Sequence, residues 1–278
     1  MLFNLLLNVN GITTKSALLV IDVQYDFVNG SLAVKGADAI IPVINDLYKQ
    51  SNVFELVIFS QDWHCAQHVS FASSHLADTT GPALSANDPH PPPFTTTLNL
   101  TYTQQGELCG YQEKYSSMGV DCTHEDHTRL IKSHQKLWPD HCIENSFGAR
   151  IVDEIVINKE RDIIVRKGTN CHIDAYSAFF DNNRLSQTEL HQNLLNAGIT
   201  DVYVVGLAFE FCVFYSAMDA RLLNYTVYVI KDATKGIDEY GIRHATRKMK
   251  KHGIILINSS QLLSPWENLD APNHTEDL

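Results

Sequence analysis

Six short apolar runs along the chain predict the strands of a sheet. They span residues 17–21, 56–60, 162–166, 202–205, 226–230 and 254–257. Within each run, aliphatic and β-branched side chains follow one another with little polar alternation. That pattern is typical of strands covered on both faces, as in a parallel sheet.

Helical periodicity occupies stretches between these runs. It predicts helices over residues 38–49, 187–197 and 240–252, and a fourth that begins at Cys212. Gly198 and Gly253 follow two of them, in the position where helices commonly stop. Strands that alternate with helices predict an α/β fold, doubly wound, with a mostly parallel six-stranded sheet and helices on both faces.

The same pattern divides the chain into three parts. We predict an N-terminal extension over residues 1–15, a single domain over 16–265 and a polar tail over 266–278. Inside the domain, residues 78–130 break the periodicity with clustered prolines and a Thr-rich run, which indicates a functional loop or an insertion. The apolar N-terminus is too short to span a bilayer and lacks the basic start and cleavage site of a signal peptide.

Composition narrows the class of partner. The net charge of −11, without a basic stretch, argues against nucleic acid, and no segment predicts a membrane association. Six cysteines in 278 residues do not resemble a disulfide framework, so we expect a cytoplasmic protein. For Cys109 and Cys122 we favour free thiols over a disulfide or a second metal site. Whether the chain forms a homo-oligomer stays open, because nothing in the sequence identifies an interface.

Five reactive side chains follow predicted strands at their C-terminal ends. They are Asp22, Asp62, His64, Lys167 and Cys212. In a doubly wound sheet these ends meet at one edge, where binding sites gather. The sequence therefore predicts a small-molecule site at that edge.

Cys212 is the candidate nucleophile of this site. It follows a tight strand-to-helix turn and enters the first helical turn, where unpaired N–H groups favour negative charge. We therefore expect its thiol to ionise more easily than a free one. Asp22 is the candidate base and Lys167 a candidate cation beside it. The alternatives are a buried structural cysteine and two ordinary charged residues at strand ends.

Asp62 and His64 are candidate metal ligands. They stand two positions apart, so they point the same way from an extended segment. This ligand pair suits zinc, or iron or manganese if waters complete the shell. A third ligand is needed, and we choose His141, with His68 left open as a further one. The alternative is a set of polar side chains without a metal.

Five segments in sequence order carry a resemblance to a known family. They are residues 20–27 (VIDVQYDF), 62–71 (DWHCAQHVSF), 138–142 (WPDHC), 167–179 and 205–213 (VGLAFEFCV). Over about residues 17–237 the chain resembles the nicotinamidases of the isochorismatase-like cysteine hydrolase superfamily. Two features depart from the pattern: the turn reads Ala-Phe-Glu-Phe-Cys where many bacterial members have Ala-Thr-Asp-x-Cys, and residues 78–130 are longer than in compact members.

The resemblance implies roles for particular residues. The implied catalytic triad is Asp22, Lys167 and Cys212. The implied metal ligands are Asp62, His64 and His141, for one divalent ion, with zinc favoured and iron or manganese left open. A cis peptide between Leu207 and Ala208 would precede an oxyanion hole made by the N–H groups of Ala208 and Cys212. The implied ring pocket is lined by Phe27, Trp138 and Tyr176.

The implied activity is hydrolysis of nicotinamide to nicotinate and ammonia through a cysteine thioester, in NAD salvage. Pyrazinamide is an analogue that the sequence does not separate from nicotinamide. Two alternatives remain: another amide hydrolase of the same superfamily, and a catalytically silent metal-binding protein of the same fold.

Overall fold

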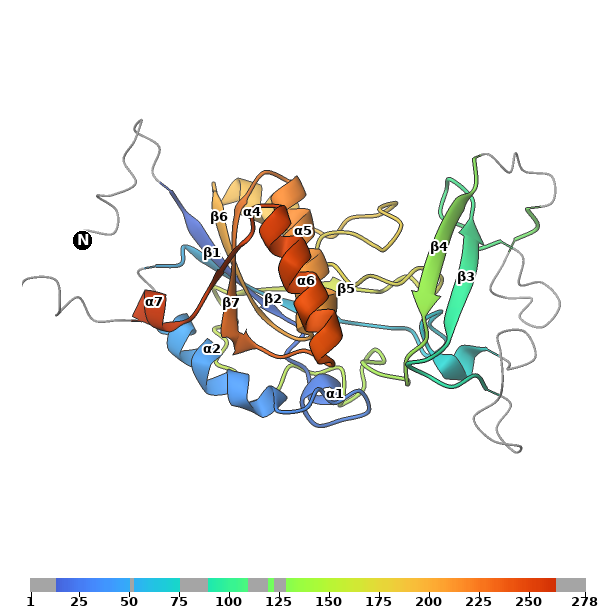
Figure 1. Cartoon of the computed structure of the whole chain (residues 1–278), viewed down its shortest axis with the longest axis horizontal. Coiled ribbons are helices and arrows are strands. Elements are labelled where there is room, and N and C mark those ends of the chain that lie inside the picture. Colours follow the sequence, from blue (N-terminus) through green and yellow to red (C-terminus); the bar gives the residue numbers. More distant parts are fainter. Residues whose placement is uncertain (1–13, 51–52, 76–89, 110–119, 123–128, 264–278) are drawn as a thin grey trace, which may run out of the picture.

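The computed structural model describes residues 14–50, 53–75, 90–109, 120–122 and 129–263 (Figure 1). Most of the expected N-terminal extension and all of the expected polar tail lie outside these ranges. Within them, every helix is too short or too polar to traverse a bilayer.

The centre of the fold is a six-stranded sheet in the order β5-β2-β1-β6-β7-β8, with every neighbouring pair parallel. Its strands are β1 (Ser16–Ile21), β2 (Leu56–Asp62), β5 (Ile163–Lys167), β6 (Asp201–Gly206), β7 (Thr226–Thr234) and β8 (Ile255–Ile257). Each coincides with one of the six apolar runs, so the predicted doubly wound fold is confirmed.

The side chains of β1 alternate between two apolar layers. Leu18 and Val20 join the layer under η1 (Ala37–Ile40) and α2 (Ile41–Tyr48). Ala17, Leu19 and Ile21 join the opposite layer. That layer packs under α4 (Leu190–Asn196), α5 (Phe214–Leu222) and α6 (Glu239–Lys251). Helices therefore cover both faces, which is why these strands carry unbroken apolar runs.

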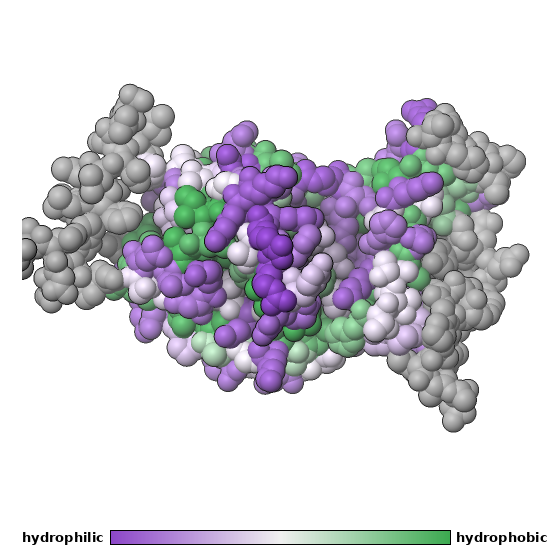
Figure 2. All heavy atoms as spheres, viewed as in Figure 1, coloured by the Kyte–Doolittle hydropathy of each residue, from purple (hydrophilic) through white to green (hydrophobic). Residues whose placement is uncertain are grey.

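The helices begin and end close to where the periodicity predicts them. The first predicted helix is divided, because its first turn is the 3₁₀ segment η1 and α2 follows with Pro42 in its own first turn. α6 buries Ala245 and Met249 and turns its charged side chains to solvent, as the hydrophilic stripe along it in Figure 2 shows. Short helices α1 (Tyr25–Val28) and α7 (Ser260–Leu263) and the helical turns η2 (Ala72–Ser74) and η3 (Phe209–Val213) complete the helices of the described residues.

A two-stranded antiparallel ribbon lies at one end of the molecule, away from the main sheet (Figure 1). It consists of β3 (Thr97–Tyr102) and β4 (Ile131–Lys136). β3 falls inside the stretch expected to be irregular, and its buried residues alternate with more exposed ones. The alternating signal is therefore present in the sequence, where the surrounding prolines and threonines obscured it.

Two disulfides join described cysteines: Cys65 with Cys171, and Cys109 with Cys122. The expectation of free thiols at Cys109 and Cys122 is therefore wrong. A backbone bridge between Cys109 and Val120 brings the second cysteine near the first, and their Cα atoms lie 5.5 Å apart. Spacing along the chain does not reveal this bridge, because it depends on how the segment returns to the ribbon.

Candidate active site and metal centre

The register of the sheet brings the predicted residues together at the C-terminal edge. Asp62 and Lys167 are the last residues of β2 and β5, and they are direct partners across the parallel pair. Asp22 follows β1, whose last residue pairs with Gly206 at the end of β6. The chain then turns through residues 207–211 to Cys212.

Lys167 is the centre of the resulting cluster. Its Nζ lies 2.9 Å from Asp22 Oδ2, 2.6 Å from Asp62 Oδ1 and 3.5 Å from Cys212 Sγ. It also donates to the carbonyl of Ala175 at 2.9 Å. Burial alone would lower the pKa of Lys167, but Asp22 and Asp62 raise it well above its ordinary value. One buried ammonium is therefore the shared counter-charge of two buried carboxylates.

Asp22 is held for proton transfer by its own hydrogen bonds. The Ser60 hydroxyl donates to Asp22 Oδ1 at 2.6 Å, and the Asp22 backbone N–H donates to Ser60 Oγ at 3.1 Å. Burial raises the pKa of Asp22 and outweighs the opposing effect of Lys167. A raised pKa makes this carboxylate a stronger base than an exposed one.

Cys212 lies in the π-helical turn η3 (Phe209–Val213), just before α5. Gly206 has a positive φ, and a Cβ there would overlap the carbonyl of Ile21, so only glycine fits at this start of the turn. The predicted cis bond between Leu207 and Ala208 is present. One oxygen of Asp22 and one of Asp62 lie within 4.8 Å of the Cys212 sulfur and of each other.

The expectation of an easily ionised thiol is wrong. Burial raises the pKa of Cys212 well above its ordinary value, and the nearby Lys167 opposes this only in part. The helix terminus did not reveal this, because the degree of desolvation depends on residues distant in sequence. A buried protonated thiol needs a base before it can attack, and Asp22 is the base within reach.

Asp62, His64 and His141 form a compact set of ligand atoms, all within 4.8 Å of one another. The Nε2 atoms of His64 and His141 lie 3.4 and 3.9 Å from Asp62 Oδ2. Their Nδ1 atoms bind the carbonyls of Gly168 and Pro139, at 2.8 and 2.7 Å. Because a carbonyl only accepts, each Nδ1 carries a proton, so the Nε2 that faces Asp62 is the ring atom that can bind a metal once it is unprotonated. The donor set therefore fits a divalent metal.

The two histidines differ in how readily they are protonated. Burial, together with His64, lowers the pKa of His141 to about 4, so this ring is neutral at physiological pH. Burial would also lower the pKa of His64, but the carboxylate of Asp62 raises it above its ordinary value. At any pH below the raised pKa of His64, a metal must therefore displace a proton from His64, whereas at physiological pH it displaces none from His141.

His68 lies beside this set. Its ring stacks on His64 with a centroid separation of 4.0 Å, and its Nδ1 is 2.7 Å from Ser70 Oγ. The ring nitrogen of His68 that could bind a metal lies within 4.8 Å of ligand atoms of His64 and Asp174, and these three form a set separate from that of Asp62, His64 and His141. Its role as a further ligand stays open.

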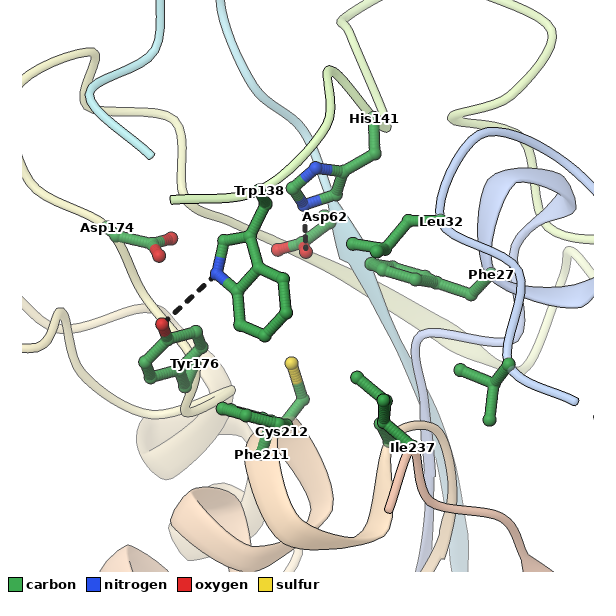
Figure 3. A pocket seen from close by; sticks show the side chains of 12 residues that line it. Phe27, Leu32, Asp62, Trp138, His141, Asp174, Tyr176, Phe211, Cys212 and Ile237 are labelled. Carbon is green, nitrogen blue, oxygen red and sulfur yellow. Dashed lines mark hydrogen bonds and ion pairs between the residues drawn. The ribbon is translucent and has the colours of Figure 1, made fainter. Parts of the chain in front are cut away.

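Aromatic side chains surround the cluster and line a small pocket (Figure 3). The predicted ring-pocket residues line it, as do both predicted oxyanion-hole residues: Phe27, Trp138, Tyr176, Ala208 and Cys212. The indole N–H of Trp138 donates to the Tyr176 hydroxyl at 3.2 Å, and Phe211 meets the indole edge-on at 4.9 Å. Flat apolar walls of this kind suit a small planar ring.

Sequence reasoning missed several residues of the site. Asp174 lines the pocket and accepts a hydrogen bond from Gln135 of β4 at 2.9 Å, so the ribbon supports the site directly. Glu210 Oε1 accepts the backbone N–H groups of Ile237 and Asp238 at 2.8 and 2.9 Å. Ile237 also lines the pocket. The acidic position inside the nucleophile turn was the available signal for Glu210.

Comparisons with known proteins agree with this geometry. The family model described as the isochorismatase domain matches residues 113–261. A relative from Acinetobacter baylyi is 35% identical over 249 residues, covering 89% of this chain and 94% of the relative. The chain belongs to the isochorismatase family of hydrolases.

Within that family the chain is similar to nicotinamidases, and the predicted resemblance is confirmed. The Acinetobacter baylyi relative is a nicotinamidase. The yeast nicotinamidase bound to the inhibitor nicotinaldehyde superposes with a TM-score of 0.69 at 27% identity, covering 87% of this chain and 99% of the yeast chain. A pyrazinamidase of Pyrococcus horikoshii in complex with zinc has a TM-score of 0.60 at 27% identity, covering 88% and 99% of the two chains.

Proposed function

We propose that this protein hydrolyses nicotinamide to nicotinate and ammonia, as part of NAD salvage. The observation that carries the proposal is one buried cluster in which Lys167 links Asp22 and Cys212 to the metal-ligand carboxylate of Asp62, on the wall of an aromatic pocket. The similarity to nicotinamidases over most of the chain supports the same substrate.

The first half of the reaction forms a thioester. Asp22 takes the thiol proton of Cys212, and the sulfur attacks the carbonyl carbon of the carboxamide. Lys167 stabilises the negative charge as it moves from the carboxylate to the sulfur, because its ammonium is 2.9 Å from the former and 3.5 Å from the latter. The C–N bond then breaks, and Asp22 returns the proton to the departing ammonia.

The second half of the reaction releases the product. Asp22, again ionised, takes a proton from water, and the hydroxide attacks the thioester carbon. The C–S bond breaks to give the carboxylic acid, which loses its proton to water as nicotinate, and the thiolate of Cys212 recovers its proton from Asp22. The backbone N–H groups of Ala208 and Cys212 stabilise the oxyanion in both halves.

Asp62, His64 and His141 would hold one divalent cation, for which two imidazoles and one carboxylate favour zinc, with iron or manganese as alternatives. The bound cation would supply a ligand position for the pyridine nitrogen, directly or through water, and so orient the ring. Phe27, Trp138 and Tyr176 hold the faces of the ring. Pyrazinamide presents a similar ring nitrogen and carboxamide, so we expect it to be a second substrate.

Two organisational proposals accompany this function. Residues 16–265 form one hydrolase domain in which residues 78–130 are an insertion, with flanking segments over 1–15 and 266–278. The cytoplasmic location expected from the sequence stays a prediction, and the two disulfides weigh against it, because disulfides persist mainly in oxidising compartments.

Ammonia release from nicotinamide tests the proposal. We expect Cys212→Ala to abolish turnover while its zinc content stays unchanged. Cys142→Ala is the matched control, since Cys142 is the other buried free cysteine among the described residues, and it should retain activity. Chelation should remove activity and added zinc, iron or manganese should restore it. An active Cys212→Ala variant would refute the mechanism, and turnover of other amides but not nicotinamide would favour a sister hydrolase.

A further inference from the structure

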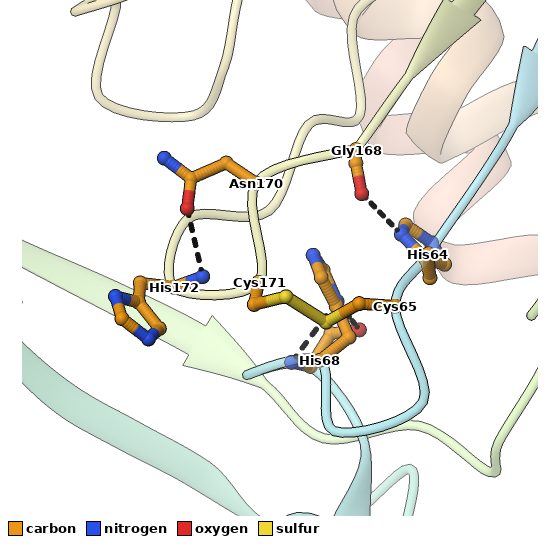
Figure 4. The surroundings of a disulfide bond; sticks show 8 residues. His64, Cys65, His68, Gly168, Asn170, Cys171 and His172 are labelled. Atoms are coloured by element: carbon orange, nitrogen blue, oxygen red, sulfur yellow. Dashed lines mark hydrogen bonds between the residues drawn. A yellow bond between two sulfur atoms is a disulfide. The ribbon is translucent and has the colours of Figure 1, made fainter. Parts of the chain in front are cut away.

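A disulfide lies directly beside the metal-ligand residues (Figure 4). Cys65 follows His64 in sequence, and Cys171 comes shortly after Lys167 and Gly168. The two cysteines are 106 positions apart in sequence, and their Cα atoms are 5.7 Å apart. The bond therefore joins the turn that carries the metal ligand to the loop that follows the catalytic lysine.

Two hydrogen bonds run alongside this bond. His64 Nδ1 donates to the Gly168 carbonyl at 2.8 Å, and the Val69 N–H donates to the Cys171 carbonyl at 2.8 Å. Gly168 has a positive φ, and a Cβ at this position would overlap the His64 ring. The imidazole therefore packs against the backbone of the facing loop, and its orientation depends on the separation between the two segments.

Neither segment has regular structure of its own to maintain that separation. Residues 63–71 contain turns and single bridges, and residues 168–178 contain turns and bends. A loop without helix or sheet hydrogen bonds gains little rigidity from its backbone. The disulfide is the covalent constraint between them.

We propose that the Cys65–Cys171 disulfide is a positioning element of the metal site. It fixes the turn of His64 and His68 against the Gly168–Cys171 loop, so that the His64 Nε2 faces Asp62 before the metal binds. Without the bond, metal binding has to order both segments, and the affinity falls. Changes to groups that orient metal ligands typically weaken affinity by about 10–100-fold, and we expect an effect of that size. The proposal rests on the metal site of the proposed function.

The test compares the zinc affinity of two double variants. Cys65→Ser/Cys171→Ser removes the bond beside the site, and Cys109→Ser/Cys122→Ser removes the other disulfide as a matched control. Each metal-free protein is titrated with zinc against a chromogenic chelator, and circular dichroism checks that it is folded. We expect the first variant to bind zinc about 10–100-fold more weakly than the unaltered chain, and the control to stay within about twofold of it.

A second measurement covers the case in which the first variant does not fold. Treatment of the unaltered protein with a phosphine and water reduces the disulfide to two thiols and oxidises the phosphine to its oxide. Zinc affinity should then fall by the same factor, both in the unaltered chain and in the Cys109→Ser/Cys122→Ser variant.

Unchanged zinc affinity after loss of the Cys65–Cys171 bond would overturn the proposal. So would four titratable thiols in the unreduced, unfolded Cys109→Ser/Cys122→Ser variant, because the Cys65–Cys171 bond would then not exist. A chain that binds zinc tightly only with the bond intact, yet does not hydrolyse nicotinamide, would keep this inference and refute the proposed activity. A chain that never binds zinc would refute the inference, whatever its activity.

Discussion

Lys167→Met should destabilise the protein more than any surface substitution. The change keeps an unbranched side chain of similar length and removes the ammonium that contacts Asp22 and Asp62. Breaking a buried ion pair by removing one partner costs about 3–5 kcal/mol, because the remaining charge stays buried without its counterion. Asp62 keeps His64 nearby, so Asp22 carries most of the penalty. We therefore expect a loss of about 3–5 kcal/mol in the free energy of unfolding at pH 7.

The stability that Lys167→Met loses should be smaller at low pH than at high pH. Burial raises the pKa of Asp22, so the native state binds this proton more readily than the unfolded chain does. Protonation relieves the unpaired charge, so the deficit of Lys167→Met should shrink as pH falls through the carboxylate pKa values and grow as pH rises. In Asp22→Asn/Lys167→Met, one of the two unpaired charges is absent, so part of the lost stability should return.

Urea unfolding of the chelator-treated protein measures these differences. Lys132→Met is the matched control, because Lys132 is an exposed lysine of β4, and it should change the free energy of unfolding by no more than about 0.5 kcal/mol. A loss below about 1 kcal/mol for Lys167→Met would refute the reasoning that this ammonium compensates two buried carboxylates. So would a double variant less stable than the single one.

Two further predictions concern the metal and the nucleophile turn. Asp62 raises the pKa of His64, so below that pKa zinc must displace a proton from the ring. Zinc affinity should therefore fall about tenfold per pH unit as the solution becomes more acidic. A zinc affinity that does not change between pH 8 and about pH 5 would contradict this. Glu210→Ala should lower the free energy of unfolding in urea by about 1–3 kcal/mol and raise KM for nicotinamide, because the N–H groups of Ile237 and Asp238 lose their acceptor. Glu210→Gln keeps an acceptor oxygen and should lose less stability. Equal losses of stability in the two variants would speak against the hydrogen bonds.

The fold and the membership of the site could be read from residue order. Strands covered on both faces need continuous apolar runs, and the crossover rule places their C-terminal ends at one edge. The sequence alone therefore predicts that Asp22, Lys167 and Cys212 share one site. Local chemistry also sufficed for the Asp62 and His64 pair, because two positions along an extended segment share a side.

Other features depended on distances between remote segments, which residue order does not specify. The pairing of Asp62 with Lys167 follows from the register of β2 and β5. The raised pKa of Cys212 follows from burial by residues far along the chain. The bond between Cys65 and Cys171 joins loops that meet only in the folded state. Burial, register and loop contact are properties of the assembled chain, so the electrostatics of this site belong to the three-dimensional structure.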